Sequence, residues 1–477
     1  MKDRCLFVWL AAMDRFFISR QVSEIASALG PVDAGNVAGK MTLNKNSKSV
    51  WGWAMYDWAN SAFATTVMAG FFPLFFKQYW SMGADINTST ALLGFGNSAA
   101  SLLVALCAPV LGVLADRGRT RKTFLICLAY SGSLATALLW VVPKGEWGWA
   151  IICYGAGMIC FAGANIFYDA LLVVVAPAPD RDRVSSLGYA MGYLGGGLLF
   201  VLNVLMVQQP QWFGLANSGQ AVRYAFLSVA LWWAGFTIFL IMWVQEEKSA
   251  LLPVNVSDFL KQGCLQLKNT VRRLFKLKSA GLFLLSYWCY MDGVDTIIRM
   301  AVDYGLSIGF TGKDLMLALL VVQFVGFPSA LVFGSLSRKW GSCNCIFIAI
   351  AGYATATLWG TFMKHRTDFY ILAVVIGLFQ GGIQALSRSY YTRFIPEGQS
   401  AEYFGLFNMM GKFSAVVGPA FVGIAGLMAR KILMPTTPTS EQLHDVGQLA
   451  SRWGIGSILL FFVAGALLLF ASIKDEE

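Results

Sequence analysis

Charged side chains are scarce in this sequence. Only 13% of the 477 residues are Asp, Glu, Lys or Arg, whereas 57% are hydrophobic. A soluble domain typically has about 25% charged residues. The composition therefore excludes a soluble globular protein and indicates that most of the chain lies in a lipid bilayer. The net charge of +10 would suggest nucleic-acid binding in a soluble protein, but here its meaning depends on which loops carry it.

Histidine is nearly absent as well. The two histidines, His365 and His444, fall in predicted loops, so proton transfer within the membrane would have to use carboxylates. Most of the nine cysteines lie in apolar segments, where they act as small hydrophobic residues, and no disulfide framework is indicated. The sequence also shows no glycine-rich phosphate loop before a lysine. We therefore expect no metal, no cofactor and no direct use of ATP.

Residues 51–80 combine a membrane span with a polar site. The middle of this stretch is apolar for about 20 residues, which is enough to cross the hydrocarbon at ~1.5 Å per residue. Asp57 and Asn60 lie inside it, one helical turn apart. A carboxylate at membrane depth normally faces a bundle interior or a watery cavity. Aromatic residues at both ends are typical of membrane interfaces; they are Trp51, Trp53, Trp58, Tyr79 and Trp80.

Hydropathy predicts twelve spans, and the longest break, residues 246–279, follows the sixth. The spans cover approximately residues 50–76, 90–114, 123–142, 147–176, 185–207, 222–245, 280–305, 314–336, 343–363, 367–392, 403–429 and 453–473. Most of the 36 lysines and arginines fall in loops on the side of the amino terminus. The positive-inside rule then places both termini in the cytoplasm. Because topology explains the basic excess, we expect no nucleic-acid partner.

Four regions follow from this division: an extension at 1–48, a six-helix bundle at 49–245, a linker at 246–279 and a second bundle at 280–477. Residues 1–40 are either a true segment or a mis-called upstream extension, since Met41 would be a natural start before the first span. In the linker, apolar residues recur every three or four positions among basic ones, which predicts an amphipathic helix on an anionic membrane surface. Binding of a partner protein is the alternative.

The two predicted halves repeat each other at three places in the same order. The matching segments are Asp57-x-x-Asn60 with Asp292-x-x-Asp295, GVLADRGR at Gly112 with GSLSRKWG at Gly334, and 179–188 with 396–405. Paired six-helix halves with a site at midplane between them are the parallel repeat of the major facilitator architecture. Gly188, Gly192 and Gly196 recur every fourth residue in the fifth span, which predicts close helix packing.

The strongest motif is GVLADRGRTRK, which begins at Gly112 after the second span. A glycine permits close helix contact, a carboxylate ends the span, and a tight basic turn keeps the loop on the cytoplasmic side. The motif resembles the signature loop of the major facilitator superfamily. The resemblance implies that Gly112, Asp116 and Arg121 form a conformational latch and do not contact the substrate.

The resemblance narrows to one branch through four strings. They are YDWANSAF at Tyr56, APAPDRDRVSSLGYAMGYLGGG at Ala176, GGIQALSRS at Gly381 and FGLFNMMGKFSAVVGP at Phe404. These strings look like the vacuole-effluxer branch, related to the amino acid exporters of fungal vacuoles, over roughly residues 48–473. The sequence lacks the long insertions of the fungal members, which favours a bacterial relative. The resemblance implies efflux of an amino acid or similar metabolite across the inner membrane of a bacterium.

Polar residues inside the spans are the candidates for substrate binding or ion coupling. They are Asp57, Asn60, Asn165, Asp169, Asp292, Asp295, Gln380, Gln384, Arg388, Asn408 and Lys412. Asp169 and Arg388 occupy near-equivalent places in the two halves, so we expect that they could form a charge pair across the cavity.

The remaining carboxylates fall into two groups, those with a basic residue one turn away on the same helix and those without one. Asp295, Arg299 and Asp303 are spaced to pair along one helix, which favours a structural role. Asp57 and Asp292 have no such cation. They are either proton carriers, with Asp57 preferred because Asn60 lies beside it, or buried carboxylates neutralised across the bundle by Arg388 or Lys412.

The sequence therefore predicts an all-α membrane protein of the major facilitator fold. It indicates a monomeric secondary transporter for a small solute, embedded in membrane lipid, not an enzyme. A proton or sodium gradient could drive it by alternating access. A lipid flippase and a membrane-embedded enzyme are the alternatives, although the longest external loop, residues 430–452, offers only Glu441, His444 and Asp445 for catalysis.

Overall fold

The computed structural model is all-helical in the part that it describes, namely residues 43–82, 86–118, 120–246, 268–274, 276–307, 312–363, 365–434 and 440–474. Lys48–Glu477 forms one compact unit, within which the contacts given below lie. Residues 1–42 of the predicted extension at 1–48 and most of the linker at 246–279 lie outside the described residues, whereas residues 43–48 belong to the first helix. Residues 268–274, within the linker, are helical.

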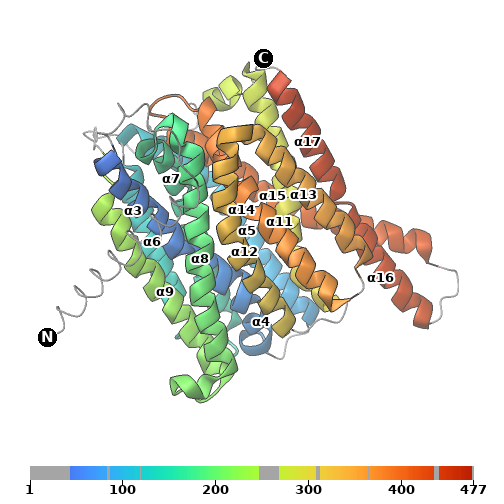
Figure 1. Ribbon diagram of the computed structural model, residues 1–477. Helices are drawn as coiled ribbons and strands as arrows, with labels where there is room; N and C mark the ends of the chain where they lie inside the picture. Colours follow the sequence, from blue (N-terminus) through green and yellow to red (C-terminus); the bar gives the residue numbers. More distant parts are fainter. Residues whose placement is uncertain are drawn as a thin grey trace, which may run out of the picture. The chain divides into compact units, whose positions relative to one another are not determined.

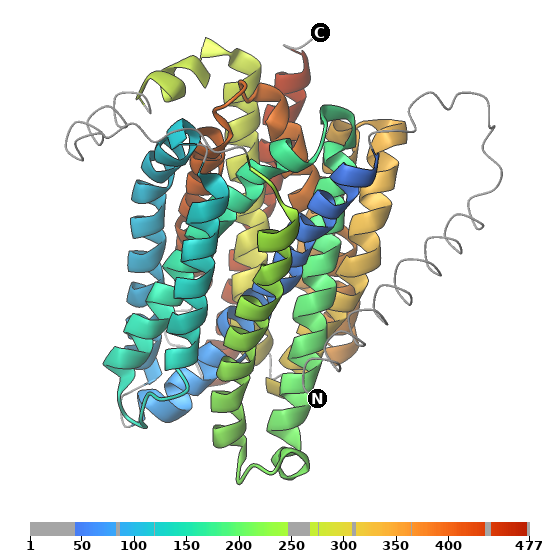
Figure 2. The same ribbon diagram turned by 90° about the vertical axis from the view of Figure 1, so that its left-hand side faces the viewer.

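In the described part of the first half, up to residue 246, a long interrupted helix is followed by five further long helices; Figures 1 and 2 show their arrangement. Its elements are α3 (Leu43–Ala62), η1 (Phe63–Phe71), α4 (Phe72–Phe75), η2 (Phe76–Trp80), α5 (Ile86–Gly118), α6 (Arg121–Leu138), α7 (Trp147–Val175), η3 (Ala178–Asp180), α8 (Arg181–Gln208), η4 (Pro210–Phe213) and α9 (Ser218–Trp243).

The second half, from residue 268, follows the same plan. Its elements are α11 (Lys278–Ser307), α12 (Gly312–Trp340), α13 (Ser342–Phe362), α14 (Arg366–Tyr391), η5 (Thr392–Phe394), α15 (Ser400–Leu433), α16 (Ser440–Gly456) and α17 (Leu459–Lys474). The helices of both halves match the predicted spans in order.

Ten helices of the described part are long and apolar enough to cross a membrane. The two predicted spans outside this set are also helical. They are α6, which has 18 residues and begins at Arg121, and α11, which contains three aspartates and an arginine. Large apolar side chains cover the outside of the helices; Leu231, Phe362 and Phe470 are 66%, 70% and 64% exposed. Such surfaces fit contact with lipid.

The prediction that residues 430–452 form a loop without helices was wrong. In the structure, α15 continues to Leu433 and α16 begins at Ser440, and the two helices contact each other. The α16 sequence is amphipathic, with Val446, Leu449 and Trp453 recurring every three or four residues. A hydropathy window averages over both faces of such a helix, so it misses the helix.

The first span departs from α-helical geometry beyond Ala62. Phe63–Phe71 and Phe76–Trp80 are π-helical, and only the turn between them, which contains Pro73, is α-helical. The first π-helical segment approaches α8 closely: a Cβ atom on Gly70 would lie 2.7 Å from Cε2 of Phe200. Long π-helical segments are rare and often mark functional positions. Hydropathy carries no signal for this geometry.

Two helix pairs make the most extensive contacts between the halves: α5 with α15, and α8 with α12. Figure 1 shows α8 beside α12. Additional contacts join α14 with α8 and α15 with α7. The polar site lies where α7, α8, α14 and α15 meet.

Candidate functional site

Arg388 of α14 lies at the centre of the contact between the halves. Its side chain is only 2% exposed, and all its recorded polar partners come from the first half. Nη1 lies 3.0 Å from Oδ1 of Asp169 in α7. Nε donates to Oγ of Ser185 at 2.9 Å, and Nη2 donates to the Ser185 carbonyl at 2.9 Å. The predicted charge pair between Asp169 and Arg388 is therefore present, and Ser185 of α8 completes it.

Aromatic rings surround the same guanidinium. Its Cζ atom lies 4.9 Å from the ring centre of Trp53, 5.2 Å from that of Tyr168 and 4.4 Å from that of Tyr189. Desolvated cation–π contacts stabilise an arginine by up to about 2 kcal/mol each. Trp53 stacks on Tyr168 at 4.3 Å and donates from Nε1 to its carbonyl. These contacts fix the aromatic rings relative to each other.

Both oxygens of Asp169 are bound by the second half. Besides Arg388 at Oδ1, Nδ2 of Asn408 in α15 donates to Oδ2 at 2.9 Å. Ser185 also reaches the second half, because its hydroxyl donates to the carbonyl of Ala385 at 2.7 Å. We refer to Asp169, Ser185, Arg388 and Asn408 as the central clamp. Opening a path between the halves at this point requires these charge-assisted bonds to break.

Asp57 lies next to the central clamp. The hydroxyl of Tyr168 donates to Oδ2 of Asp57 at 3.1 Å, and that of Ser61 donates to Oδ1 at 3.3 Å. Tyr168 also presents its ring to Arg388. The aspartate is thus linked to the clamp through Tyr168. Gly192 makes this arrangement possible, since its Cβ would lie 2.6 Å from Oγ of Ser61. The predicted close packing at this glycine is confirmed.

Three other candidates from the sequence, Asn60, Asn165 and Gln384, form side-chain hydrogen bonds on the helices that carry the central clamp and Asp57. Asn60 donates to Asn165 at 2.6 Å, and Tyr193 donates to Gln384 at 3.1 Å. Gln380 is half-buried, and its Oε1 has no hydrogen-bond partner among the described residues.

Asp292 lies away from the central clamp, between α11 and α15. It is fully buried, and its Oδ1 accepts from the backbone N–H of Gly418 at 2.8 Å. Its neighbours Asp295 and Lys412 are half-buried, and each takes part in a further interaction. The predicted ladder continues to Arg299 and Asp303, whose side chains lie outside the described part. Neutralisation of Asp292 across the bundle by Arg388 is not supported, because Arg388 binds Asp169.

The latch residues meet the first turn of α15. The Asp116 carboxylate accepts from the backbone N–H groups of Ala401 and Glu402 at 3.0 and 2.8 Å, and from Nε of Arg121 at 2.7 Å. A carboxylate at this position is stabilised by the positive end of the helix. Burial raises the pKa of the Asp116 carboxyl, while Arg121 and the two N–H groups lower it and offset part of that effect.

Glu246 joins the latch to the end of α9. It accepts from the backbone N–H of Lys122 at 2.8 Å and lies 3.9 Å from Nε of Arg121. Burial raises the pKa of the Glu246 carboxyl, and the contacts with Lys122 and Arg121 act against this. Lys122 in turn donates from Nζ to the carbonyls of Ile241 and Val244 at 2.8 and 2.6 Å, at the end of α9.

The predicted repeat is visible in a matching contact between α8 and α12. A Cβ on Gly112 would lie 2.6 Å from the carbonyl carbon of Ala401, and one on Gly334 would lie 2.6 Å from Cβ of Ser186 in α8. Arg338, which matches Asp116, pairs with Asp180 at 2.9 Å, directly before α8. Asp116 in the first half thus contacts the start of α15, and Arg338, at the matching position of the second half, contacts the residue before α8. The two positions carry opposite charges, because an arginine replaces the aspartate.

Several contributors were not predicted from sequence. Tyr189 and Ser185 lie within one of the family-like strings, so the resemblance could have indicated them. Trp53 was interpreted as an interfacial residue, but it is fully buried. Trp80 is also fully buried, whereas Trp51 is 39% exposed. Tryptophan suits an interface and a buried cation–π site equally well, so composition alone cannot separate the two.

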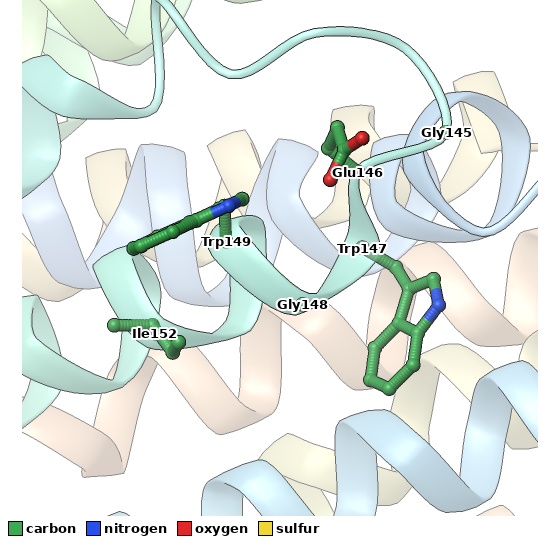
Figure 3. Close-up of a pocket in the computed structure, with 6 residues that line it drawn as sticks. All are labelled: Gly145, Glu146, Trp147, Gly148, Trp149 and Ile152. Atoms are coloured by element: carbon green, nitrogen blue, oxygen red, sulfur yellow. The ribbon is translucent and has the colours of Figure 1, made fainter.

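A pocket on the surface is separate from these sites. It lies at the start of α7 and is lined by Gly145, Glu146, Trp147, Gly148, Trp149 and Ile152 (Figure 3). In Figure 3, Trp147 and Trp149 point away from each other. Trp149 is 62% exposed. This arrangement is typical of aromatic residues at a membrane interface.

Comparison with known proteins agrees with this geometry. A family model described as "Vacuole effluxer Atg22 like" matches residues 80–428. An uncharacterized MFS-type transporter of Bacillus subtilis, YxiO, is 32% identical over 431 residues, which cover 89% of this chain and 95% of the relative. The chain belongs to the vacuole effluxer family of major facilitator superfamily transporters. This membership confirms a transporter and excludes the predicted alternative of an enzyme family.

More distant members of the vacuole effluxer family match most of the chain. Autophagy-related protein 22 of Candida glabrata is 23% identical over 472 residues, which cover 80% of this chain and 85% of the relative. The human organic anion transporter MFSD10 has a similar structure, with a TM-score of 0.65, 14% identity and coverage of 89% and 99%. The transporter FucP in its outward conformation matches with a TM-score of 0.60 and 10% identity, over 88% of this chain and 98% of FucP. These structures confirm the major facilitator fold.

Proposed function

We propose that this member of the vacuole effluxer family exports an amino acid or a similar small carboxylate by alternating access. The observation that carries the proposal is the central clamp, in which Arg388 of the second half is held by Asp169 and Ser185 of the first. Alternating access needs strong contacts between the halves that exist in one state and break in another. A buried ion pair of this kind fits such a role.

A substrate carboxylate could replace Asp169 at Arg388. The guanidinium presents its N–H groups in a planar fork that matches any carboxylate, and the Asp169 carboxylate occupies that position now. Trp53, Tyr168 and Tyr189 would hold the guanidinium in place during the exchange. The description of the matching family model, "Vacuole effluxer Atg22 like", supports the outward direction.

The topology belongs to the same proposal. The loop charges favour cytoplasmic termini, which would place the Asp116 latch and the Arg338–Asp180 pair on the cytoplasmic side of a bacterial inner membrane. Two six-helix bundles, residues 49–245 and 280–477, would move relative to each other about the central clamp. Labelling of a cysteine at Thr123 by an impermeant maleimide from outside intact cells would contradict this orientation.

Transport by purified protein in liposomes tests the function. Liposomes loaded with a labelled amino acid mixture should lose label faster when the full chain is present. Arg388→Lys keeps the charge but loses the planar fork, so it should weaken apparent substrate affinity by about tenfold or more, since hydrogen bonds to charged groups contribute about 1.5–3 kcal/mol. Arg430→Lys, at an exposed position of α15, is the matched control.

Three results would oppose the proposal. Equal affinity in wild type and Arg388→Lys would exclude Arg388 from substrate recognition. Movement of a headgroup-labelled lipid from one leaflet to the other, with no loss of amino acid from the liposomes, would favour the flippase alternative. Loss of amino acid at the same rate from protein-free liposomes would exclude transport under these conditions.

A further inference from the structure

Two oxygen atoms between α11 and α15 lack partners despite full burial. Asp292 and Thr296 are both 0% exposed. Gly418 donates to Oδ1 of Asp292, but Oδ2 of Asp292 and Oγ1 of Thr296 accept no hydrogen bond from the described residues. A buried, unpaired carboxylate oxygen is costly, more so inside a membrane. The Thr296 hydroxyl can donate to the carboxylate, but such a bond leaves the buried negative charge in place.

Both side chains converge on one backbone position. Asp292 and Thr296 are one helical turn apart on α11, so they lie on the same face. A Cβ on Gly418 would collide with Oγ1 of Thr296 and with Oδ1 of Asp292, so only glycine fits there. The carboxyl and the hydroxyl therefore approach the same point on α15.

A single proton would satisfy both oxygens. A neutral Asp292 carries an O–H donor at Oδ2, and the Thr296 hydroxyl can accept from it. Oδ1 then remains the acceptor for Gly418. A proton on Asp292 thus removes the buried charge and still allows a hydrogen bond with Thr296, with the carboxyl as the donor.

The surrounding groups favour the neutral form. Asp295 lies one helical turn from Asp292 on α11, and its negative charge, when ionised, disfavours a second charge on Asp292. Cys289 lies three residues before Asp292 on the same helix. On α15, Lys412 precedes Gly418 by six residues, which places it on a different face of the helix. On α13, the side chain of Tyr353 is fully buried and lies near Asp295. On α17, Phe462 covers Gly293.

The contact lies at a weak point of α15. Pro419 follows Gly418 directly and has no N–H group, so the carbonyl of Ala415 loses its usual helical donor. Helices bend at such positions. The same helix donates to Asp116 at its first turn and to Asp169 through Asn408. A change at Gly418 can therefore be transmitted along one helix to the latch and to the central clamp.

We propose that Asp292 and Thr296 form a protonation site that controls the position of α15. The protonated form stabilises the close contact between α11 and α15 seen here, and loss of the proton separates the two helices at Gly418. This inference rests on the proposed transport function and names its coupling ion as the proton. It also replaces Asp57 with Asp292 as the preferred carrier, because both carboxylate oxygens of Asp57 accept hydrogen bonds from hydroxyls, whereas Oδ2 of Asp292 has no hydrogen-bond partner among the described residues.

The test measures helix position as a function of pH in the purified full chain. Spin labels at Leu427 of α15 and Leu467 of α17, both more than 60% exposed, report the distance, since α17 packs on α11. Native cysteines are replaced first. Wild type should show a pH-dependent change in distance. Asp292→Asn, whose amide can serve as donor to Thr296, should keep the short distance at all pH values.

Two further variants keep the proposal testable if Asp292→Asn folds poorly. Thr296→Val removes the hydroxyl that can donate to the ionised carboxylate, so the charged form loses a partner and the transition should move to higher pH by about one pH unit, the equivalent of one hydrogen bond. Asp295→Asn should retain the transition, with a midpoint at lower pH because one neighbouring negative charge is lost. A transition that is unchanged in both Asp292→Asn and Thr296→Val would overturn the proposal. So would a transition driven by sodium at constant pH.

Failure of this proposal can be separated from failure of the proposed function. If labelled solute is transported by wild type while the pH-dependent distance change persists in Asp292→Asn, transport stands and the protonation site is wrong. If no solute is transported but Asp292→Asn abolishes the distance change, the protonation site stands and the proposed substrate class fails.

Discussion

Gly112→Ala provides the sharpest test of the latch. A Cβ at this position would lie 2.6 Å from the carbonyl carbon of Ala401 and 2.9 Å from Cα of Glu402. Both are backbone atoms at the start of a helix, so they cannot rotate away. The ends of α5 and α15 must separate, and the hydrogen bonds from Ala401 and Glu402 to Asp116 lengthen beyond their present 3.0 and 2.8 Å.

The expected magnitude follows from those two bonds. Hydrogen bonds to a charged group contribute about 1.5–3 kcal/mol each. Water replaces part of this when the latch opens, so we take the lower value and expect a loss of about 3 kcal/mol. That corresponds to roughly a 100-fold shift away from the closed latch. Gly94→Ala is the control: it lies on the same helix, and no atom is within 4 Å of the added Cβ.

Distances between spin labels at Thr123 and Glu397, both exposed positions near the two ends of the latch, would measure the shift. We expect a longer distance to dominate in Gly112→Ala and the wild-type distribution to persist in Gly94→Ala. The reasoning is refuted if Gly112→Ala folds and retains the short distance, because the close approach would then not hold the latch closed.

Three further predictions concern transport in liposomes. Asp116→Asn should slow turnover while equilibrium substrate affinity changes by less than about tenfold, or ~1.4 kcal/mol; loss of binding with normal turnover at saturation would contradict the latch role. Asp57→Asn should retain accumulation driven by a gradient, because Asp292 is the proposed carrier; loss of accumulation with substrate exchange intact would instead make Asp57 the coupling group, as the sequence alone favours. Ser185→Ala should weaken substrate binding by no more than about tenfold, and by less than Arg388→Lys, because Arg388 loses only its bond to the Ser185 hydroxyl, about 1.5 kcal/mol, and keeps its bond to the Ser185 carbonyl; equal losses in both variants would contradict this order.

The helical plan could be predicted from sequence because it depends on long apolar segments, which hydropathy measures directly. The pairing of Asp169 with Arg388 could also be predicted, since a buried charge requires a partner and the repeat placed the two residues at matching depth. Asn408 was recognised as polar, although its contact with Asp169 was not.

The remaining errors have physical causes. The π-helical geometry of Phe63–Phe71 changes the hydrogen-bond register without changing hydropathy. Trp53 was assigned to the interface because its indole suits both environments, and only the fold shows Arg388 above it. The role of Gly418 was invisible for another reason: a glycine shows its function only when the neighbouring side chains, here Asp292 and Thr296, are placed in space.

The two matched contacts between the halves should respond differently to ionic strength. Asp116 is 9% exposed and is held by backbone groups, so salt screens it weakly. Arg338 and Asp180 have side-chain exposures of 53% and 47%, and such surface pairs are weak and readily screened. Raising the salt concentration would therefore loosen the contact between α12 and α8 while leaving that between α5 and α15 intact. Of the two matched contacts, the one at α12 would therefore be the first to weaken as salt is raised.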